Sequence, residues 1–84
     1  LRKTVTTVGR ALDNDIHLES GDVSRHHARF EQSEEGLRVV DLNSTNGTRV
    51  NGRPIRTATY VKAGDEISFG TLSAQLLPFT GDSR

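Results

Sequence analysis

Three short polar clusters in this 84-residue chain carry the side chains that could do chemistry: residues 9–10 (GR), 24–27 (SRHH) and 43–48 (NSTNGT). Together they offer guanidinium groups, hydroxyls, side-chain amides and backbone N–H groups. An arginine fork donates two parallel hydrogen bonds to an oxyanion such as phosphate, and neutral donors can fill the remaining oxygens. Glycine near each cluster lets the backbone approach a ligand closely. These residue types therefore predict a site that binds an oxyanion.

The adjacent histidines His26 and His27 raise the alternative of a metal site. Neighbouring residues of a strand point to opposite faces, so the two rings could not readily bind one ion. The chain has no cysteine, and no spaced set of Asp or Glu completes a coordination shell. We therefore expect neither a metal nor any other cofactor. We interpret His27 as a hydrogen-bonded structural residue and His26 as a solvated residue at the rim.

A hydrolase is a further alternative, because Ser24, a histidine and Asp41 could form a triad on paper. No nucleophile-elbow glycine pattern surrounds Ser24, and the neighbouring Arg25 suits holding an anion better than activating a hydroxyl. The glycine-rich P-loop pattern that ends in Lys and Ser or Thr is missing as well. The sequence therefore predicts a binding module and not an enzyme.

The segments between the clusters have the pattern of short β-strands. They are rich in Val, Ile, Thr and Phe, they alternate apolar and polar residues, as in ARFE at 28–31, and turn signals such as Asn-Gly separate them. No segment shows a long apolar stripe at helical spacing. We predict strands at residues 4–8, 16–18, 26–32, 37–42, 48–50, 66–69 and 72–78. Many short strands are typical of an all-β sandwich or barrel, with the polar clusters on its loops.

Length, charge and composition narrow the class further. We expect a single domain over residues 1–84, with a frayed polar tail at 79–84. Eleven basic residues balance eleven acidic ones, which argues against nucleic acid and anionic membranes as partners, and no apolar run is long enough to cross a bilayer. The absence of cysteine fits an intracellular compartment, cytoplasmic or, in a eukaryote, nuclear. Because the first residue is not Met, we expect a piece of a longer protein.

Four blocks, taken in order, make the sequence resemble the forkhead-associated (FHA) domain family. They are GRALDNDI at 9–16, VSRHHA at 23–28, DLNSTNGT with VNG at 41–52, and GDEISFG at 64–70. Each block alone is weakly specific, but the four in order and at sensible spacing cover residues 8–77. The resemblance implies an eleven-strand β-sandwich of two mostly antiparallel, twisted sheets. It also implies a module that binds phosphothreonine peptides.

The resemblance implies a role for particular residues of each loop. Arg10 and Ser24 would bind the phosphate, and Arg25 would contribute to the same site. Thr45 and Asn46 would also contact the ligand, the asparagine through the peptide backbone. Structural support of the binding loops is implied for three more residues: Gly9, His27 and Gly47.

Each of these assignments has an alternative that the sequence leaves open. Arg10 could instead pair with Asp13 or Asp15, as surface arginines near acids usually do. Arg25 could pair with Asp22. The serine, threonine and asparagine of the clusters could simply shape turns.

Residues next to a phosphothreonine must be recognised by neighbouring loops, and Arg49, Arg53 and Arg56 are the candidates. These arginines would favour acidic or aromatic flanking residues. The sequence departs from the family in one respect, because only eight residues precede Gly9 and the first strand of the family could be lacking. An uncovered edge beside residues 72–77 could then support dimers.

We therefore predict a non-catalytic adaptor that docks a threonine-phosphorylated segment, on another protein or elsewhere on the same one. A Ser/Thr kinase acting upstream is implied as a partner. The alternative is a scaffold that binds proteins, or a second copy of itself, without phosphate.

Overall fold

The structure is a computed structural model and describes residues 4–76. It contains nine strands: β1 (Thr4–Gly9), β2 (Ile16–His17), β3 (Ala28–Ser33), β4 (Gly36–Asp41), β5 (Thr48–Val50), β6 (Arg53–Pro54), β7 (Thr59–Val61), β8 (Glu66–Phe69) and β9 (Leu72–Gln75). No helix is present within this range, and hence none that could span a membrane. The all-β prediction is confirmed.

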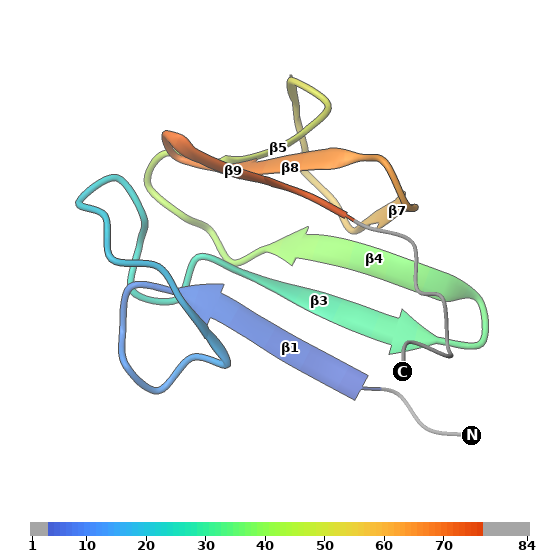
Figure 1. The fold of residues 1–84 in the computed structure, drawn as a ribbon, viewed down its shortest axis with the longest axis horizontal. Helices are drawn as coiled ribbons and strands as arrows, with labels where there is room; N and C mark the ends of the chain where they lie inside the picture. Colours follow the sequence, from blue (N-terminus) through green and yellow to red (C-terminus); the bar gives the residue numbers. More distant parts are fainter. Residues whose placement is uncertain (1–3, 77–84) are drawn as a thin grey trace, which may run out of the picture.

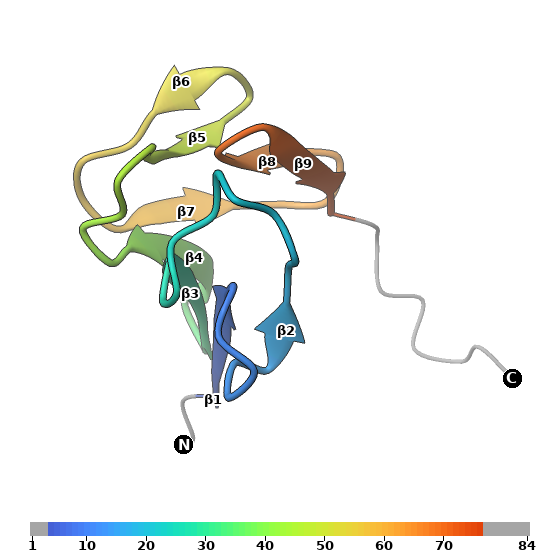
Figure 2. The ribbon, with the colours of Figure 1, turned by 90° about the vertical axis from the view of Figure 1, so that its left-hand side faces the viewer.

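The strands form two sheets that face each other (Figures 1 and 2). One sheet has the order β2-β1-β3-β4-β7, and the other has the order β6-β5-β8-β9. All neighbouring strands are antiparallel except β1 and β2, which pair in parallel. The prediction of a mostly antiparallel two-sheet sandwich is therefore confirmed, with nine strands in the described part against the eleven that the resemblance implies.

The predicted strands agree with the observed ones within one residue at most boundaries and differ by more at three places. β3 begins at Ala28 and not at residue 26, because the chain curls so that the ring of His27 contacts the backbone of Ser24. β6 and β7 were not predicted, because two or three residues are too few to show an alternating pattern. β9 ends at Gln75. Residues 77 and 78 of the predicted strand and the tail at 79–84 lie outside the described residues.

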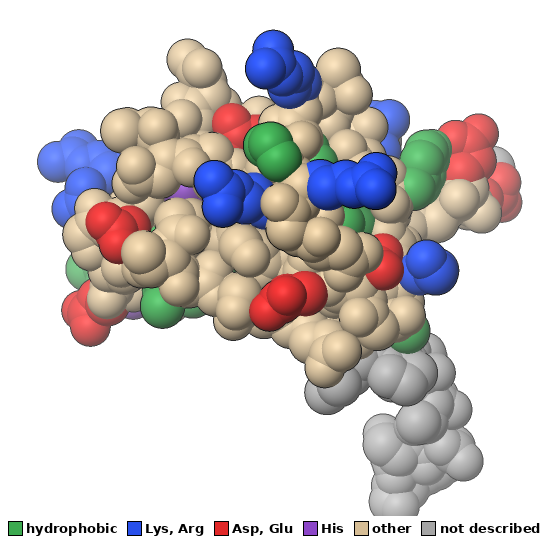
Figure 3. All heavy atoms as spheres, turned by 90° about the horizontal axis from the view of Figure 1, so that it is seen from above, with side chains coloured by type: hydrophobic (Ala, Val, Ile, Leu, Met, Phe, Trp, Pro, Cys, Tyr) green, Lys and Arg blue, Asp and Glu red, His purple; other side chains and the backbone are tan. Residues whose placement is uncertain are grey.

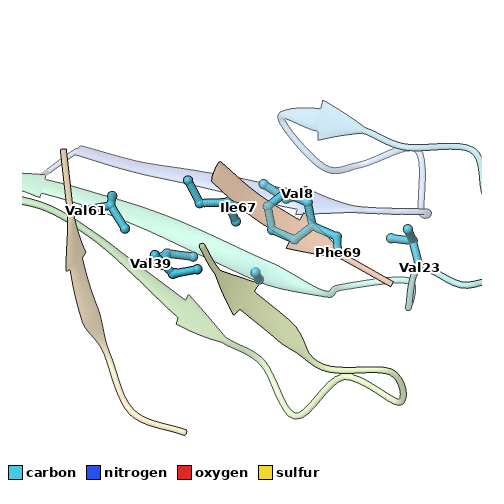
Figure 4. Packing of buried hydrophobic residues seen from close by; sticks show 8 residues of the cluster. Val8, Val23, Val39, Val61, Ile67 and Phe69 are labelled. Atoms are coloured by element: carbon cyan, nitrogen blue, oxygen red, sulfur yellow. The ribbon is translucent and has the colours of Figure 1, made fainter. Parts of the chain in front are cut away.

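Alternating residues of the strands fill the space between the sheets with small apolar side chains (Figure 4). Ile67 and Phe69 of β8 point to the same side and are buried, as expected for a period of two. The rings of Phe69 and Phe30 pack edge to face, with centroids 6.3 Å apart. The buried core consists of Val8, Val23, Ala28, Val39, Val50, Val61, Ile67 and Phe69. This core holds the strands whose ends carry the polar clusters.

The Asn51-Gly52 turn between β5 and β6 adopts the backbone that the sequence predicts for a two-residue hairpin. Asn51 has φ 53° and Gly52 has φ 85°, so both central residues are left-handed, as a type I′ turn requires. The Asn51 side chain adds a bond to Asp65 at 3.1 Å, and it accepts one from the backbone N–H of Glu66 at 2.9 Å. The hairpin is therefore fixed to β8.

Candidate anion-binding site

The three polar clusters lie on loops at one end of the sandwich, at the left of Figure 1. The backbone N–H of Arg10 donates to the carbonyl of Ser24 at 3.0 Å, which joins the first loop to the second. The backbone N–H of Thr45 donates to the hydroxyl of Ser24 at 3.0 Å, which joins the third loop to the second. Ser24 therefore lies at the meeting point of the three loops.

An open cavity of about 350 Å³ lies between these loops. All five residues that the sequence predicts as ligand contacts line it: Arg10, Ser24, Arg25, Thr45 and Asn46. The remaining lining residues are Gly21, Asp22 and Val23. The structure thus brings together residues that are far apart in the sequence.

Gly9 lies where the first two loops approach most closely. A Cβ atom on Gly9 would lie 2.1 Å from the carbonyl oxygen of Arg25 and 2.8 Å from the side-chain nitrogen of Asn14. Only glycine leaves room for this approach. The approach in turn allows the backbone bonds from Arg10 to Ser24 and from Ala11 to Arg25, the second at 3.1 Å.

Asn14 is a supporting residue to which the sequence analysis assigned no role. Its side chain is buried, and its amide nitrogen donates to the carbonyls of Ala11 at 2.8 Å and Arg25 at 2.7 Å. It therefore ties the loop after β1 to the residue that follows Ser24. The only sequence feature that could have indicated this role is the position of Asn14 in the 9–16 block, and that block does not predict that the side chain is buried.

His27 is fully buried and joins the second loop to the third. Its Nδ1 accepts a hydrogen bond from the backbone N–H of Ser24 at 3.1 Å, and its Nε2 lies 2.8 Å from the carbonyl oxygen of Gly47. A carbonyl can only accept, so Nε2 must carry the proton, and the two bonds together require the neutral ring. The ring also packs edge to face on Phe69, with centroids 5.6 Å apart.

Asp41 organises the third loop from the end of β4. Its carboxylate accepts bonds from the hydroxyls of Ser44 and Thr48, both at 2.6 Å, and from the backbone N–H of Ser44 at 3.1 Å. Burial would raise the pKa of Asp41, but these hydrogen bonds stabilise the charged form and hold the pKa below its usual range. The Ser44 hydroxyl also accepts from the N–H of Gly47 at 2.9 Å. The type of Asp41 and its place at the start of the 41–52 block did not predict this supporting role.

The triad alternative has no geometric support. The hydroxyl of Ser24 accepts from Thr45, and its contact with His27 is made through the backbone N–H. The carboxylate of Asp41 is occupied by the hydroxyl groups of its own loop. Within residues 4–76 these three side chains form no hydrogen-bonded relay.

The acidic residues near Arg10 have other partners. Asp13 lies 3.2 Å from Nε2 of His26, and Asp15 accepts from the backbone N–H of Thr7 at 2.9 Å. The Nε–H group of Arg10 donates to the carbonyl of Val23 at 3.0 Å, which holds the side chain against the second loop. No carboxylate of the described residues lies within ion-pair distance of Arg10. Its exposed guanidinium keeps donors for a ligand.

Arg25 is likewise exposed and forms no ion pair with a described residue. The sequence alternative was Asp22, but the carboxylate of Asp22 accepts from the hydroxyl of Thr71 at 2.8 Å. Figure 3 shows Lys and Arg side chains standing out at the left-hand end of the molecule, where these loops lie. Two cationic groups and several neutral donors therefore face one cavity.

Asp22 also connects the cavity to the turn between β8 and β9. Its carbonyl accepts from the side-chain amide of Asn46 at 2.8 Å, and a Cβ on Gly70 would lie 2.5 Å from the same oxygen. A second cavity of about 300 Å³ adjoins the first here, and both are lined by Asp22 and Asn46. No pattern in the sequence connects the Gly70–Thr71 turn with the site.

The three arginines that the sequence suggested for flanking residues do not lie together. Arg49 lines the second cavity, beside Asn46. Arg53 and Arg56 line a third cavity, which shares no lining residue with the other two. Only Arg49 is therefore placed next to the candidate anion-binding site.

Comparison with known proteins agrees with the fold and the loops. The FHA domain model matches residues 6–70. The oxoglutarate dehydrogenase inhibitor of Corynebacterium glutamicum is 46% identical over 70 residues, which cover 83% of this chain and 48% of that protein. The glycogen accumulation regulator GarA of Mycobacterium tuberculosis is 41% identical over 70 residues, covering 83% and 43%. The chain thus spans about half the length of these curated relatives.

Solved structures agree as well. A chain from a structural and functional analysis of phosphothreonine-dependent FHA domain interactions superposes with a TM-score of 0.85 and 32% identity, covering 94% of this chain and 81% of that one. The N-terminal FHA domain of Rad53p from S. cerevisiae, in complex with a phosphothreonine peptide, gives a TM-score of 0.73 and 33% identity, covering 81% and 57%. The chain belongs to the forkhead-associated (FHA) domain family.

Proposed function

We propose that this domain is a non-catalytic adaptor that binds a phosphothreonine-containing segment in the cavity lined by Arg10, Ser24, Arg25, Thr45 and Asn46. The observation that carries the proposal is the convergence of three loops on Ser24, with two arginines beside it that lack carboxylate partners among the described residues. The Rad53p domain, whose structure contains a phosphothreonine peptide, supports the choice of ligand.

The charge of the ligand matches the donors of the cavity. A phosphothreonine carries a charge of about −1.5 to −2 at neutral pH, because its second pKa is near 6. Arg10 and Arg25 would compensate this charge with their guanidinium groups. The hydroxyl of Ser24 already accepts from the N–H of Thr45, so its own proton is free to be donated to a phosphate oxygen. Affinity should therefore fall as the pH drops below about 6.

Thr45 and Asn46 would contact the ligand from the third loop. Both are exposed, and the amide nitrogen of Asn46 is held by the carbonyl of Asp22. Its side-chain oxygen would then accept a hydrogen bond from a peptide N–H group. Arg49, in the adjoining cavity, would then meet residues beside the phosphothreonine and favour acidic ones.

The domain would act by localisation, because the cavity holds donors for an anion and no hydrogen-bonded catalytic relay. The phosphorylated segment would lie on another protein or elsewhere on the same one. A Ser/Thr kinase would create the ligand. Docking would then depend on the activity of that kinase.

Titration calorimetry with a degenerate phosphothreonine peptide library tests the proposal, with phosphoserine and unphosphorylated libraries as controls. Arg10→Ala and Ser24→Ala should each weaken binding by about ten- to a hundredfold, because a hydrogen bond to a charged group contributes about 1.5–3 kcal/mol. Glu34→Gln removes an exposed charge outside the cavity and should leave the affinity unchanged. Equal binding of phosphorylated and unphosphorylated libraries would refute the proposal.

A second candidate function is self-association through β9. This strand is the outer strand of its sheet, and an unpaired edge can pair with another copy. An apolar groove of about 170 Å³ runs beside it, lined in part by Leu72, Leu76 and Leu18. Sedimentation velocity should then show a dimer that Leu72→Glu dissociates. A monomer at every concentration would remove this candidate.

A further inference from the structure

A cationic hollow of the described surface lies away from the candidate anion-binding site. It has a volume of about 780 Å³ and is bounded by β6, β7 and the segment that connects them. Its lining includes Arg53, Arg56, Lys62, Tyr60 and Ile55. We refer to it as the basic hollow. It shares no lining residue with the cavity around Ser24.

The positive charges of the basic hollow are largely free. Arg53 and Arg56 are exposed, and neither lies within ion-pair distance of a carboxylate in residues 4–76. Lys62 is 85% exposed and lies 3.7 Å from Asp65, a long contact. Because the whole chain has no net charge, three cations around one hollow do not follow from a general basic excess.

The acidic groups nearby are already engaged by hydrogen bonds. Asp65 is buried in the floor and accepts from the side chain of Asn51 at 3.1 Å and from the backbone N–H of Lys62 at 2.9 Å. These bonds hold the pKa of Asp65 below its usual range, so it stays charged. At the rim, Glu35 accepts from the hydroxyl of Tyr60 at 3.2 Å. The lining itself therefore keeps three cations against one carboxylate.

The chemistry of the basic hollow differs from that of the cavity around Ser24. Two of its backbone donors are occupied, since the N–H of Asn51 bonds to Glu66 at 2.7 Å and the N–H of Ile55 bonds to Thr48 at 3.0 Å. The neutral side-chain donors of the lining also have partners: Asn51 donates to Asp65, Thr59 to the carbonyl of Thr57 and Tyr60 to Glu35. The separate, flexible side chains of Arg53, Arg56 and Lys62 can each form an ion pair with a different carboxylate of a ligand. The half-exposed ring of Tyr60 and the side chain of Ile55 offer apolar surface to the stems of such residues.

We propose that the basic hollow docks an acidic, unphosphorylated segment of a partner protein. Carboxylates spaced along that segment pair with Arg53, Arg56 and Lys62. Binding there does not require a phosphate and uses no residue of the cavity around Ser24. A partner that carries both a phosphothreonine and an acidic segment would then be held at two places, and its affinity would exceed that of a short phosphopeptide.

Amide NMR titration of the whole chain with a capped hexaglutamate peptide tests the proposal. The amide resonances of residues 53–62 should shift, and the shifts should weaken as the salt concentration rises. The double variant Arg53→Gln/Arg56→Gln should weaken the peptide about tenfold, because each exposed ion pair contributes modestly. Lys62→Gln gives an independent variant at a highly exposed side chain.

Controls separate this proposal from that of phosphothreonine binding. Arg10→Gln changes the charge by the same amount per site and should keep hexaglutamate binding while it loses phosphothreonine-peptide binding. The double variant Arg53→Gln/Arg56→Gln should keep phosphothreonine-peptide binding and bind hexaglutamate more weakly. Inorganic phosphate should shift the residues around Ser24 and leave residues 53–62 unchanged. The absence of hexaglutamate shifts at 53–62, an unchanged hexaglutamate affinity in the double variant, or an equal response of 53–62 to inorganic phosphate would each overturn the proposal.

Discussion

The close approach at Gly9 makes Gly9→Ala a direct test of how the site is built. The added Cβ would lie 2.1 Å from the carbonyl oxygen of Arg25, well inside the distance at which atoms touch. The obstructing atom belongs to the backbone and cannot move aside by changing a rotamer. The loops after β1 and before β3 must therefore separate, and the bonds from Arg10 to Ser24 and from Ala11 to Arg25 must lengthen.

The expected loss of stability follows from two effects of similar size. Overpacking in a closely packed region costs about 1–3 kcal/mol. Weakening two backbone hydrogen bonds costs about 0.5–1.5 kcal/mol each. Because separating the loops relieves part of the overlap while it breaks the bonds, we expect about 3 kcal/mol rather than the full sum. For a domain of this size, that lowers the melting temperature by roughly 10–25 °C.

Urea denaturation measures this loss, with Gly21→Ala as the matched control. A Cβ on Gly21 would have no atom within 4 Å, so this variant should be neutral or slightly stabilised by a less flexible unfolded chain. Gly9→Ala should in addition bind phosphothreonine peptides more weakly, since Arg10 and Ser24 move apart. If the free energies of unfolding of the two variants agree within about 0.5 kcal/mol, the close approach is not real and the account of the site fails.

Three further predictions concern the residues that support the loops. The ¹⁵N shifts of His27 at neutral pH should show a neutral ring with the proton on Nε2; a proton on Nδ1 would contradict the bond from Ser24. The Asp41→Asn variant should be less stable than the unaltered domain at pH 7, because the amide group of Asn would place its own donors against two hydroxyl donors. Denaturation at a series of pH values from 7 to 3 measures this difference. The pKa of Asp41 is lower in the folded domain than in the unfolded chain. Its contribution to the free energy of unfolding is therefore complete above the unfolded pKa of about 3.9 and is lost as the pH falls through the folded pKa. The Asp41→Asn variant should therefore lose less stability in acid than the unaltered domain. Thr71→Val should weaken phosphothreonine-peptide binding about threefold, because it loses the hydrogen bond to Asp22, whereas Thr71→Ser should keep that bond and the affinity. Equal affinities of Thr71→Val and the unaltered domain in calorimetry would show that the turn does not position the site.

The fold could be predicted from the sequence where strands are long enough to show their period. β3 and β8 alternate apolar and polar residues, and the Asn51-Gly52 turn has the residues that a two-residue hairpin demands. β6 and β7 have no such signal, because their pairing depends on neighbours that only the folded chain supplies. The parallel pairing of β1 with β2 depends in the same way on the path of residues 10–15.

The composition of the site could be predicted, but its support could not. Short clusters of arginine, serine and asparagine predict an anion-binding site from their residue types alone. Asn14 and Thr71 are ordinary loop residues, and their importance comes from the backbone that each approaches in the folded domain. Such contacts join residues 11 to 49 positions apart, beyond the reach of any local pattern.

The separation of Arg49 from Arg53 shows how one register decides what a side chain can do. Across the hairpin, Val50 is paired with Arg53 and Arg49 is paired with Pro54. Paired residues point to the same face of a sheet, and neighbours on a strand point to opposite faces. Arg53 therefore shares the side of the buried Val50, where the basic hollow lies, while Arg49 points away from it. Sequence proximity placed both in one specificity group, and the alternation of the strand divides them.

The loops are held in place by groups other than the two arginines of the cavity. Neutral His27, the amide of Asn14 and the hydroxyl of Ser44 satisfy backbone groups of all three loops, whereas Arg10 and Arg25 have no carboxylate partner in the described chain. Because the loops are connected before any ligand arrives, binding does not have to order them, and the free energy of the new charged hydrogen bonds goes into affinity. Pairing either arginine with a carboxylate would have made the loops no more rigid, since they are already joined through Ser24, and it would have cancelled the charge that a phosphate needs. The arrangement therefore leaves the positive charge of two arginines available at a preformed cavity.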